Sequence, residues 1–224
     1  MEHAEETLAE IKQVKERGRR LAHGGVWLPA LLLAALVLAG ALLYRYPFEE
    51  PAGEWWSHPY WAGLPSAVRS DVGAYLFWFL GLPLVVLASA AWYRWRGRRV
   101  GVKVAWPWFA GVTLVVLALL AVIASIPTKA VTPHDPFGGW QGLLSPLIVV
   151  AIATIALGFV ERSPGLVFGG VWAGLVTGWP CVSGMGRIPG GQVTLLGVDR
   201  PGPVLILAAL PLLVVALVSL WRKP

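Results

Sequence analysis

The pattern of hydrophobic and polar positions along the chain is dominated by long apolar runs that alternate with polar stretches. The apolar runs lie near residues 26–44, 73–93, 106–126, 142–160, 165–182 and 203–221. A run of roughly 18 apolar residues is long enough to cross a bilayer as an α-helix, and a soluble core helix is rarely apolar all round for that length. The pattern therefore predicts an all-α fold, a polytopic membrane helix bundle with about six transmembrane helices.

Residues 1–24 precede the first apolar run and have a polar, helix-forming pattern. Ala4, Ile11 and Gly18 recur every seven residues, which is typical of a weakly amphipathic helix. Glutamates crowd the first half of this segment and lysines and arginines the second half, an order that complements a helix dipole. We expect two parts in the chain, a cytoplasmic amphipathic helix at 1–24 and a six-span transmembrane domain at 25–224.

The amino-acid composition supports a membrane protein. Of the 224 residues, 57% are hydrophobic and 13% are charged, and the mean hydropathy is +0.67. A soluble domain has about 25% charged residues, so this chain lacks the charge that solvates a globular surface. A net charge of +6 would suggest nucleic acid in a soluble protein. Here the position of the charges matters more than their sum, and we expect no nucleic-acid partner.

Lysine and arginine are unevenly divided between the two sides of the predicted spans. Thirteen of the 18 fall on one side, in the N-terminal segment, between the second and third spans, at Arg162 and at the C-terminal end. The positive side is normally cytoplasmic. With an even number of spans, both termini then lie in the cytoplasm. We expect a multi-pass protein of the cell membrane.

Arginines gather at two of these cytoplasmic positions, directly beside the membrane. They are Arg19 and Arg20 before the first span and Arg94, Arg96, Arg98 and Arg99 after the second. Anionic lipid headgroups attract cations at this depth. We expect these arginines to set the topology and to contact such headgroups, and docking of a cytoplasmic protein partner is the alternative for 94–99.

Titratable side chains are missing from the middle of the predicted spans, where no Asp, Glu, Lys, Arg or His falls. Charges at that depth are costly and usually serve proton relays, ion coupling or voltage sensing. Their absence argues against a proton-coupled transporter, a pump and a voltage sensor, and leaves open a passive pore or an exporter that a separate ATPase drives. No Gly-rich phosphate loop is present, so we expect neither a nucleotide motor nor a cofactor.

Candidate catalytic and metal-binding residues are few. Ser183 precedes a glycine, but no histidine lies in a span to act as its base, so we expect no enzyme. His58, His134 and Asp135 lie in the predicted outer loops together with several glutamates. Their spacing matches no ligand motif, and a metal site on these loops remains the alternative reading.

Small residues recur at helical spacing in the fifth predicted span, at Gly170, Gly174 and Gly178. Glycines four residues apart share one helix face and let two backbones approach closely in lipid. We expect this face to pack tightly against another helix of the same chain. A seam between two copies, in a homo-oligomer, is the alternative.

The segments Glu6–Ile11 and Arg17–Leu21, which run into Gly25-Val26-Trp27, resemble the start of uncharacterised actinobacterial multi-span membrane proteins. The similarity covers about the first 30 residues and carries no catalytic residue. Such proteins often accompany small winged-helix regulators. The resemblance therefore implies a membrane partner in a regulatory or stress-response pair.

The layout also resembles the membrane subunit of small ABC-type exporters. Those have a cytoplasmic amphipathic helix, six spans and a larger outer connection before the last span, which the helix at 4–21 and the loop at 183–202 match. The connection at 94–105 departs from the plan, because it is short for a helix that docks an ATPase. The resemblance implies a permease whose ATPase is a separate subunit.

Three hypotheses for function follow from the sequence. The first is a non-enzymatic membrane protein that works through protein–protein contacts, as a membrane partner, scaffold or sensor. The second is the exporter permease. The third is a membrane enzyme or metal-binding protein that uses the outer loops.

Overall fold

A computed structural model of the chain describes residues 25–45, 63–64, 68–100, 105–125, 145–183 and 201–221. In this part of the chain, six α-helices and one short 3-10 helix form. They are α2 (Trp27–Gly40), η1 (Ala41–Tyr44), α3 (Asp71–Val100), α4 (Trp106–Ser125), α5 (Pro146–Val160), α6 (Pro164–Ser183) and α7 (Pro201–Trp221). The predicted all-α class is confirmed. The amphipathic helix expected at 1–24 lies outside the described residues.

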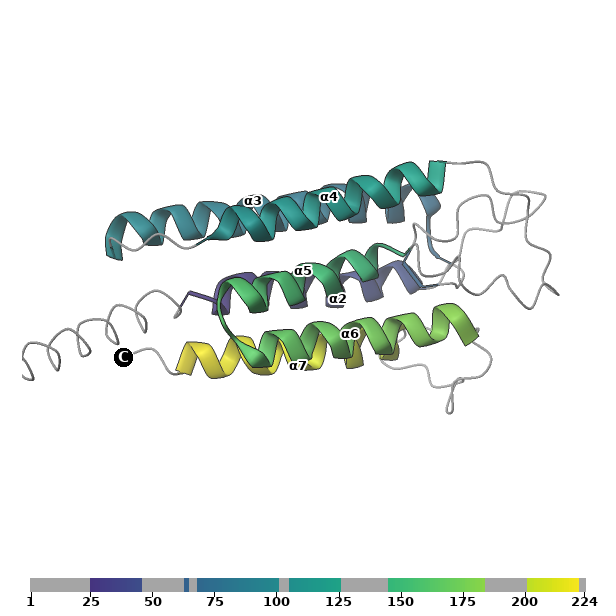
Figure 1. Ribbon diagram of the computed structural model, residues 1–224. Coiled ribbons are helices and arrows are strands. Elements are labelled where there is room, and N and C mark those ends of the chain that lie inside the picture. Colours follow the sequence, from purple (N-terminus) through teal and green to yellow (C-terminus); the bar gives the residue numbers. More distant parts are fainter. Residues whose placement is uncertain are drawn as a thin grey trace, which may run out of the picture.

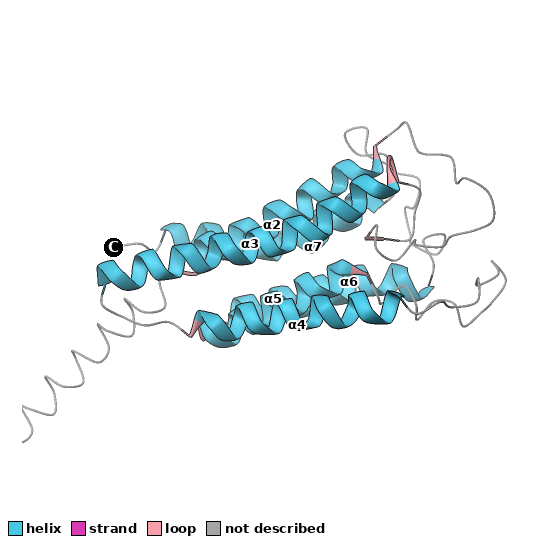
Figure 2. Cartoon of the chain, turned by 90° about the horizontal axis from the view of Figure 1, so that it is seen from above, coloured by secondary structure: helices cyan, strands magenta, loops and turns pink. Residues whose placement is uncertain are grey.

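The helices are stacked as two layers of three (Figures 1 and 2). One layer holds α3, α2 and α7 in that order, and the other holds α4, α5 and α6. Within the layers, α2 packs against both α3 and α7, and α5 packs against both α4 and α6. Between the layers, α3 meets α4, α2 meets α5, and α6 meets α7. The bundle therefore closes as a ring in which the first and the last described helices are neighbours.

Successive helices run in alternating directions, so the connections divide between two ends of the bundle (Figure 1). The first end holds Gly25 at the start of α2, the last turns of α3, the turn at 161–163 and the end of α7. Because α3 brings its arginines there, we call it the basic end. The other end, called the loop end, holds Arg45 and the Gly63-Leu64 segment.

Four helical segments are long and apolar enough to cross a membrane, namely Trp27–Tyr44, Val72–Arg99, Trp106–Ile123 and Gly202–Trp221. The helix α5 is apolar but shorter, with 15 residues. The glycines, tryptophans and prolines of α6 score low on hydropathy scales, and α6 is not among the four. By helix length and composition, the chain is a multi-span membrane protein.

The helix α3 differs from the prediction at its C-terminal end. The sequence pattern placed the end of the second span at residue 93 and a connection at 94–105, but α3 remains helical to Val100. Charge marks where the hydrocarbon ends, whereas only a helix-breaking residue ends the helix itself. Arginine and tryptophan favour helix, and the guanidinium of Arg99 lies 4.2 Å from the ring centre of Trp95, one turn earlier.

The α5–α6 pair is the tightest contact between helices. A Cβ atom added at Gly170 would lie 2.8 Å from the carbonyl oxygen of Ala151 and 2.9 Å from the backbone nitrogen of Ile155. At Gly174 it would lie 3.4 Å from the Cβ of Ala151, an ordinary contact, and Gly178 is buried. At Gly170 and Gly174, the glycine face of α6 is therefore covered by α5 of the same chain.

The loop end is closed by a segment that enters between η1 and α3. Leu64 is fully buried, and the buried Tyr44 hydroxyl accepts a hydrogen bond from its backbone nitrogen at 2.6 Å and donates one to its carbonyl oxygen at 3.2 Å. Gly63 has a φ of 115°, which favours glycine, and an added Cβ would lie 2.8 Å from the Tyr44 oxygen. Only glycine fits this approach.

Candidate functional site at the basic end

The turn between α5 and α6 contains two adjacent charged residues whose side chains point in opposite directions. It closes with hydrogen bonds from the backbone nitrogen of Arg162 to the Phe159 oxygen (3.3 Å) and from that of Ser163 to the Gly158 oxygen (2.9 Å). These bonds form a Schellman motif, in which the residue after the helix cap adopts the left-handed conformation. Arg162 does so, with a φ of 51°. As a result, Arg162 is exposed and the preceding Glu161 is buried.

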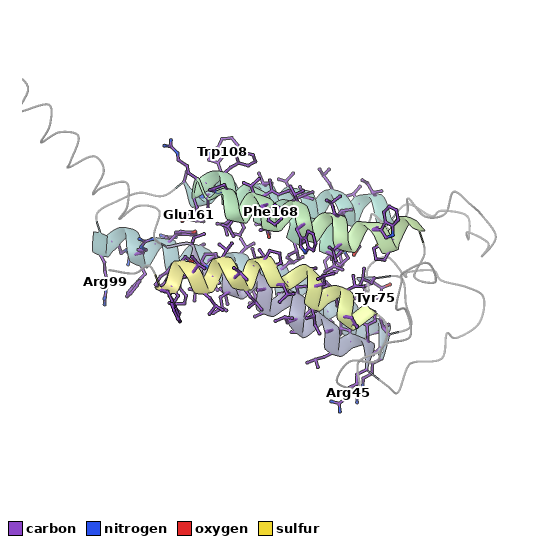
Figure 3. The ribbon with its side chains drawn as sticks, turned by 90° about the horizontal axis from the view of Figure 1, so that it is seen from below. Arg45, Tyr75, Arg99, Trp108, Glu161 and Phe168 are labelled. Atoms are coloured by element: carbon purple, nitrogen blue, oxygen red, sulfur yellow. The ribbon has the colours of Figure 1, made fainter. Side chains whose placement is uncertain are left out.

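Glu161 is the centre of the site. Its side chain is only 3% exposed, and Tyr93 and Arg96 of α3 are the groups that act on it. Burial raises the pKa of the Glu161 carboxyl from 4.5 to about 7, because the carboxylate loses its hydration, while the neighbouring Tyr93 hydroxyl and the charge of Arg96 act in the opposite direction. Glu161 can therefore change its protonation near neutral pH. Figure 3 shows it at the same end of the bundle as Arg99, opposite Arg45.

Tryptophans fasten the start of α2 to α3 beside this carboxyl group. The indole nitrogen of Trp92 donates a hydrogen bond to the carbonyl oxygen of Gly25 at 2.9 Å. Trp27 meets Trp92 edge to face with ring centres 5.3 Å apart, and Trp92 stacks on Trp95 at 5.1 Å. The guanidinium of Arg96 lies directly over Gly25, where a Cβ would collide with it. Arg96 is thus held on the side of α3 that faces into the bundle.

The four arginines that follow the second predicted span differ in their burial. Arg96 is half-buried and contributes to the electrostatics of Glu161, whereas Arg94, Arg98 and Arg99 are exposed on the last turns of α3. Arg19 and Arg20 lie outside the described residues.

The chemistry that this arrangement supports is proton binding at Glu161. Among the side chains that the structure describes, Glu161 is the only carboxylate, and no group of three His, Cys, Asp or Glu that could hold a metal ion occurs there. The free thiol of Cys181 is buried in α6, toward the loop end. The metal-binding candidates His58, His134 and Asp135 lie outside the described residues.

Sequence reasoning missed Glu161 because it treated residues 161–164 only as a tight turn. The available signal was an acidic residue directly after a 15-residue apolar helix, with an arginine next to it and the following helix starting at Pro164. In this turn one of the two charged side chains is buried and the other is exposed. What the sequence does not show is that α3 covers one of them.

Comparison of the chain with protein-family models, with curated protein sequences and with solved structures finds no match.

Proposed function

We propose that the chain is a six-span integral protein of the cell membrane with its basic end in the cytoplasm. The alternation of the six described helices supports this, since α5 and α6 lie within the same ring as the four long apolar helices. The division of lysines and arginines between the two ends supports the orientation. Both termini are then cytoplasmic.

The topology proposal is tested by reporter fusions after Pro224. A reporter that is active only in the cytoplasm should give a signal, and one that is active only outside it should be silent. A fusion after Ser183, at the other end of α6, should show the reverse. The same result at both positions would contradict the six-span arrangement.

We further propose that the protein works by contact with a cytoplasmic protein that has an acidic surface, and that the exposed arginines of α3 form the contact. The observation that carries this proposal is the continuation of α3. Its 30 residues extend about 45 Å, whereas the hydrocarbon of a bilayer is about 30 Å thick. The last turns therefore stand clear of the hydrocarbon and present Arg94, Arg98 and Arg99 on a rigid helix.

The local packing gives this helix end the stiffness that a docking surface needs. Trp92 is hydrogen-bonded to Gly25, which precedes α2, and Trp95 lies between Trp92 and the guanidinium of Arg99. An arginine that is already ordered loses less conformational entropy when it pairs with a carboxylate. The exporter hypothesis has less support, because the five residues between Val100 and Trp106 are too few for a separate docking helix.

Charge reversal tests the contact proposal. The triple variant Arg94→Glu, Arg98→Glu and Arg99→Glu should lose proteins that co-purify with the wild type from native membranes in mild detergent. The matched control is Arg45→Glu with Arg69→Glu, which reverses exposed arginines at the loop end and should keep them. An unchanged set of co-purifying proteins in the triple variant would contradict the proposal, and recovery of an ATPase subunit would favour the exporter.

A further inference from the structure

An apolar groove runs along the outside of the bundle between α4 and α5. Its volume is about 470 Å³. The residues that line it are all hydrophobic, and they are Trp108, Val112, Ile152, Ile155, Ala156, Phe159 and Val160. Trp108 is 73% exposed and Phe159 is 70% exposed, so their rings form the outer walls rather than part of the core.

The position of the groove along the bundle fixes the depth at which a ligand would lie. Trp108 belongs to the first turn of α4 and Phe159 to the last turn of α5, so both lie at the basic end. Figure 3 shows Trp108 on the outside of the bundle at the same end as Glu161 and Arg99. From there the groove continues past Val112 and Ile152 toward the middle of the spans. It therefore begins at headgroup level and descends into hydrocarbon.

Arg162 follows the groove residues of α5 closely in sequence, at the basic end of the groove. It follows the lining residues Phe159 and Val160 in the α5–α6 turn, and its side chain is exposed. Its φ of 51° is one that glycine adopts freely and that arginine adopts only at a cost in free energy. Glu161, its neighbour in sequence, is turned into the bundle. The turn thus places an exposed arginine at headgroup level, two residues after the last residue that lines the groove.

We propose that the α4–α5 groove binds one anionic phospholipid, with an acyl chain against the lining residues and the phosphate at the guanidinium of Arg162. The guanidinium matches phosphate geometry and binds it through two parallel hydrogen bonds. The all-hydrophobic lining offers no partner for the backbone polar groups of an extended peptide, whereas an acyl chain has no polar groups to pair. This site is distinct from the docking surface on α3 and requires only that the bundle is embedded in a membrane.

Two substitutions separate the headgroup contact from the chain contact. Arg162→Gly removes the guanidinium and also relaxes the left-handed turn, so the variant should fold at least as well as the wild type. Ala156→Phe fills the groove with a ring. The matched controls are Arg69→Ala, which removes an exposed arginine of the loop end, and Ala118→Phe, which adds a ring to the exposed face of α4 outside the groove.

The measurement is native mass spectrometry of protein released from nanodiscs that contain equal amounts of phosphatidylglycerol and phosphatidylcholine with the same acyl chains. The wild type should retain one phosphatidylglycerol with about a fivefold preference, the contribution expected of one arginine near the surface. Arg162→Gly should abolish the preference, Ala156→Phe should lose retained lipid of both kinds, and both controls should behave as the wild type.

Each other outcome overturns the proposal. Equal retention of the two lipids by the wild type, or an undiminished preference in Arg162→Gly, would show that this arginine does not select the headgroup. Full retention in monodisperse Ala156→Phe would show that lipid binds elsewhere. A dimer that forms without lipid and dissociates in Ala156→Phe would assign the groove to a second copy of the chain.

Discussion

The α5–α6 pair and the α3–α4 pair are both antiparallel helical hairpins, but they are held together in different ways. Nine of the 15 residues of α5 are buried, whereas only 22% of the Trp106–Ile123 segment of α4 is buried. The first pair is joined by a turn of three residues and packs backbone against backbone at Gly170. Figure 1 shows the second pair at one edge of the bundle, and Figure 2 shows that α3 belongs to one layer and α4 to the other.

The difference teaches that the placement of glycine, rather than its abundance, decides how closely membrane helices approach. Gly111 of α4 is also a helical glycine, but a Cβ added there would meet no atom within 4 Å. Lipid tails solvate apolar side chains as well as another helix does, so hydrophobicity alone does not pull α3 and α4 together. Their exposed leucines and valines therefore remain in contact with lipid, while Gly170 allows van der Waals contact along α5.

A second difference is where each pair is fastened. The seam between α5 and α6 is held along its length by packing. The helix α3 is fastened at the basic end by the hydrogen bond between Trp92 and Gly25. At the loop end, the Gly63-Leu64 segment that Tyr44 binds lies against Trp78 of α3. We therefore expect different kinds of substitution to weaken the two regions.

The largest effect is expected from Gly170→Ala. Its Cβ would press on backbone atoms of Ala151 and Ile155, which cannot rotate away. Overpacking of this kind costs about 3 kcal/mol of unfolding free energy, measured by reversible denaturation in detergent micelles. Gly111→Ala is the control in the loosely packed pair, and it should be neutral or stabilising by up to about 1 kcal/mol. Equal changes in unfolding free energy for Gly170→Ala and Gly111→Ala would contradict the conclusion that the α5–α6 pair is packed more closely than the α3–α4 pair.

The next effect depends on pH and concerns the turn that joins α5 to α6. Because the pKa of Glu161 is raised in the folded protein to about 7 from 4.5, the folded state binds a proton that the unfolded state has released. Stability is then highest below pH 4.5 and falls as the pH rises to 7, by about 3 kcal/mol at most. Thermal unfolding in detergent at several pH values measures this slope.

Glu161→Gln is the control for that slope, because the amide is neutral at every pH. The variant should lose the decline in stability between pH 4.5 and 7 and should match the wild type at low pH. A slope that survives unchanged in Glu161→Gln would assign the titration to a different group.

A smaller effect is expected at the segment that Tyr44 binds at the loop end. Tyr44→Phe keeps the ring but leaves the buried backbone nitrogen and oxygen of Leu64 without the hydroxyl that pairs with both. Such a loss costs about 2 kcal/mol, and it should be independent of pH between 4.5 and 7, unlike the effect at Glu161. Hydrogen exchange at Leu64 reports the same change locally, and unaltered protection there would contradict the role of Tyr44.

The smallest effect is expected from Arg99→Ala. The guanidinium contacts Trp95 on an exposed part of α3, where a cation–π contact contributes about 0.5–1 kcal/mol. We expect slight fraying of the last turn of α3, visible by spin labelling at position 98, with no measurable change in the α5–α6 seam. A loss of global stability comparable to that of Gly170→Ala would show that the two regions are not independent.

Hydrophobic patterning predicted most of the helices, since the run at 106–126 corresponds to α4 and the run at 165–182 to α6. It could not predict that α3 continues through its arginines, because the boundary of an apolar run follows solvent rather than backbone hydrogen bonding. The burial of Glu161 and the closer approach at Gly170 than at Gly174 depend on which helix lies opposite, and on its rotation. These features result from tertiary packing, which the local periodicity of the sequence does not encode.

The ring order has a consequence for biogenesis. The helix α2 leaves the ribosome first among the described helices, yet α7, which leaves last, covers one of its faces. In the segment Trp27–Tyr44, half of the residues are buried in the finished bundle. During translation, this face of α2 remains in contact with lipid or with an insertase until α7 is integrated. A chain that stalls before α7 would present the uncovered face to membrane quality-control proteases.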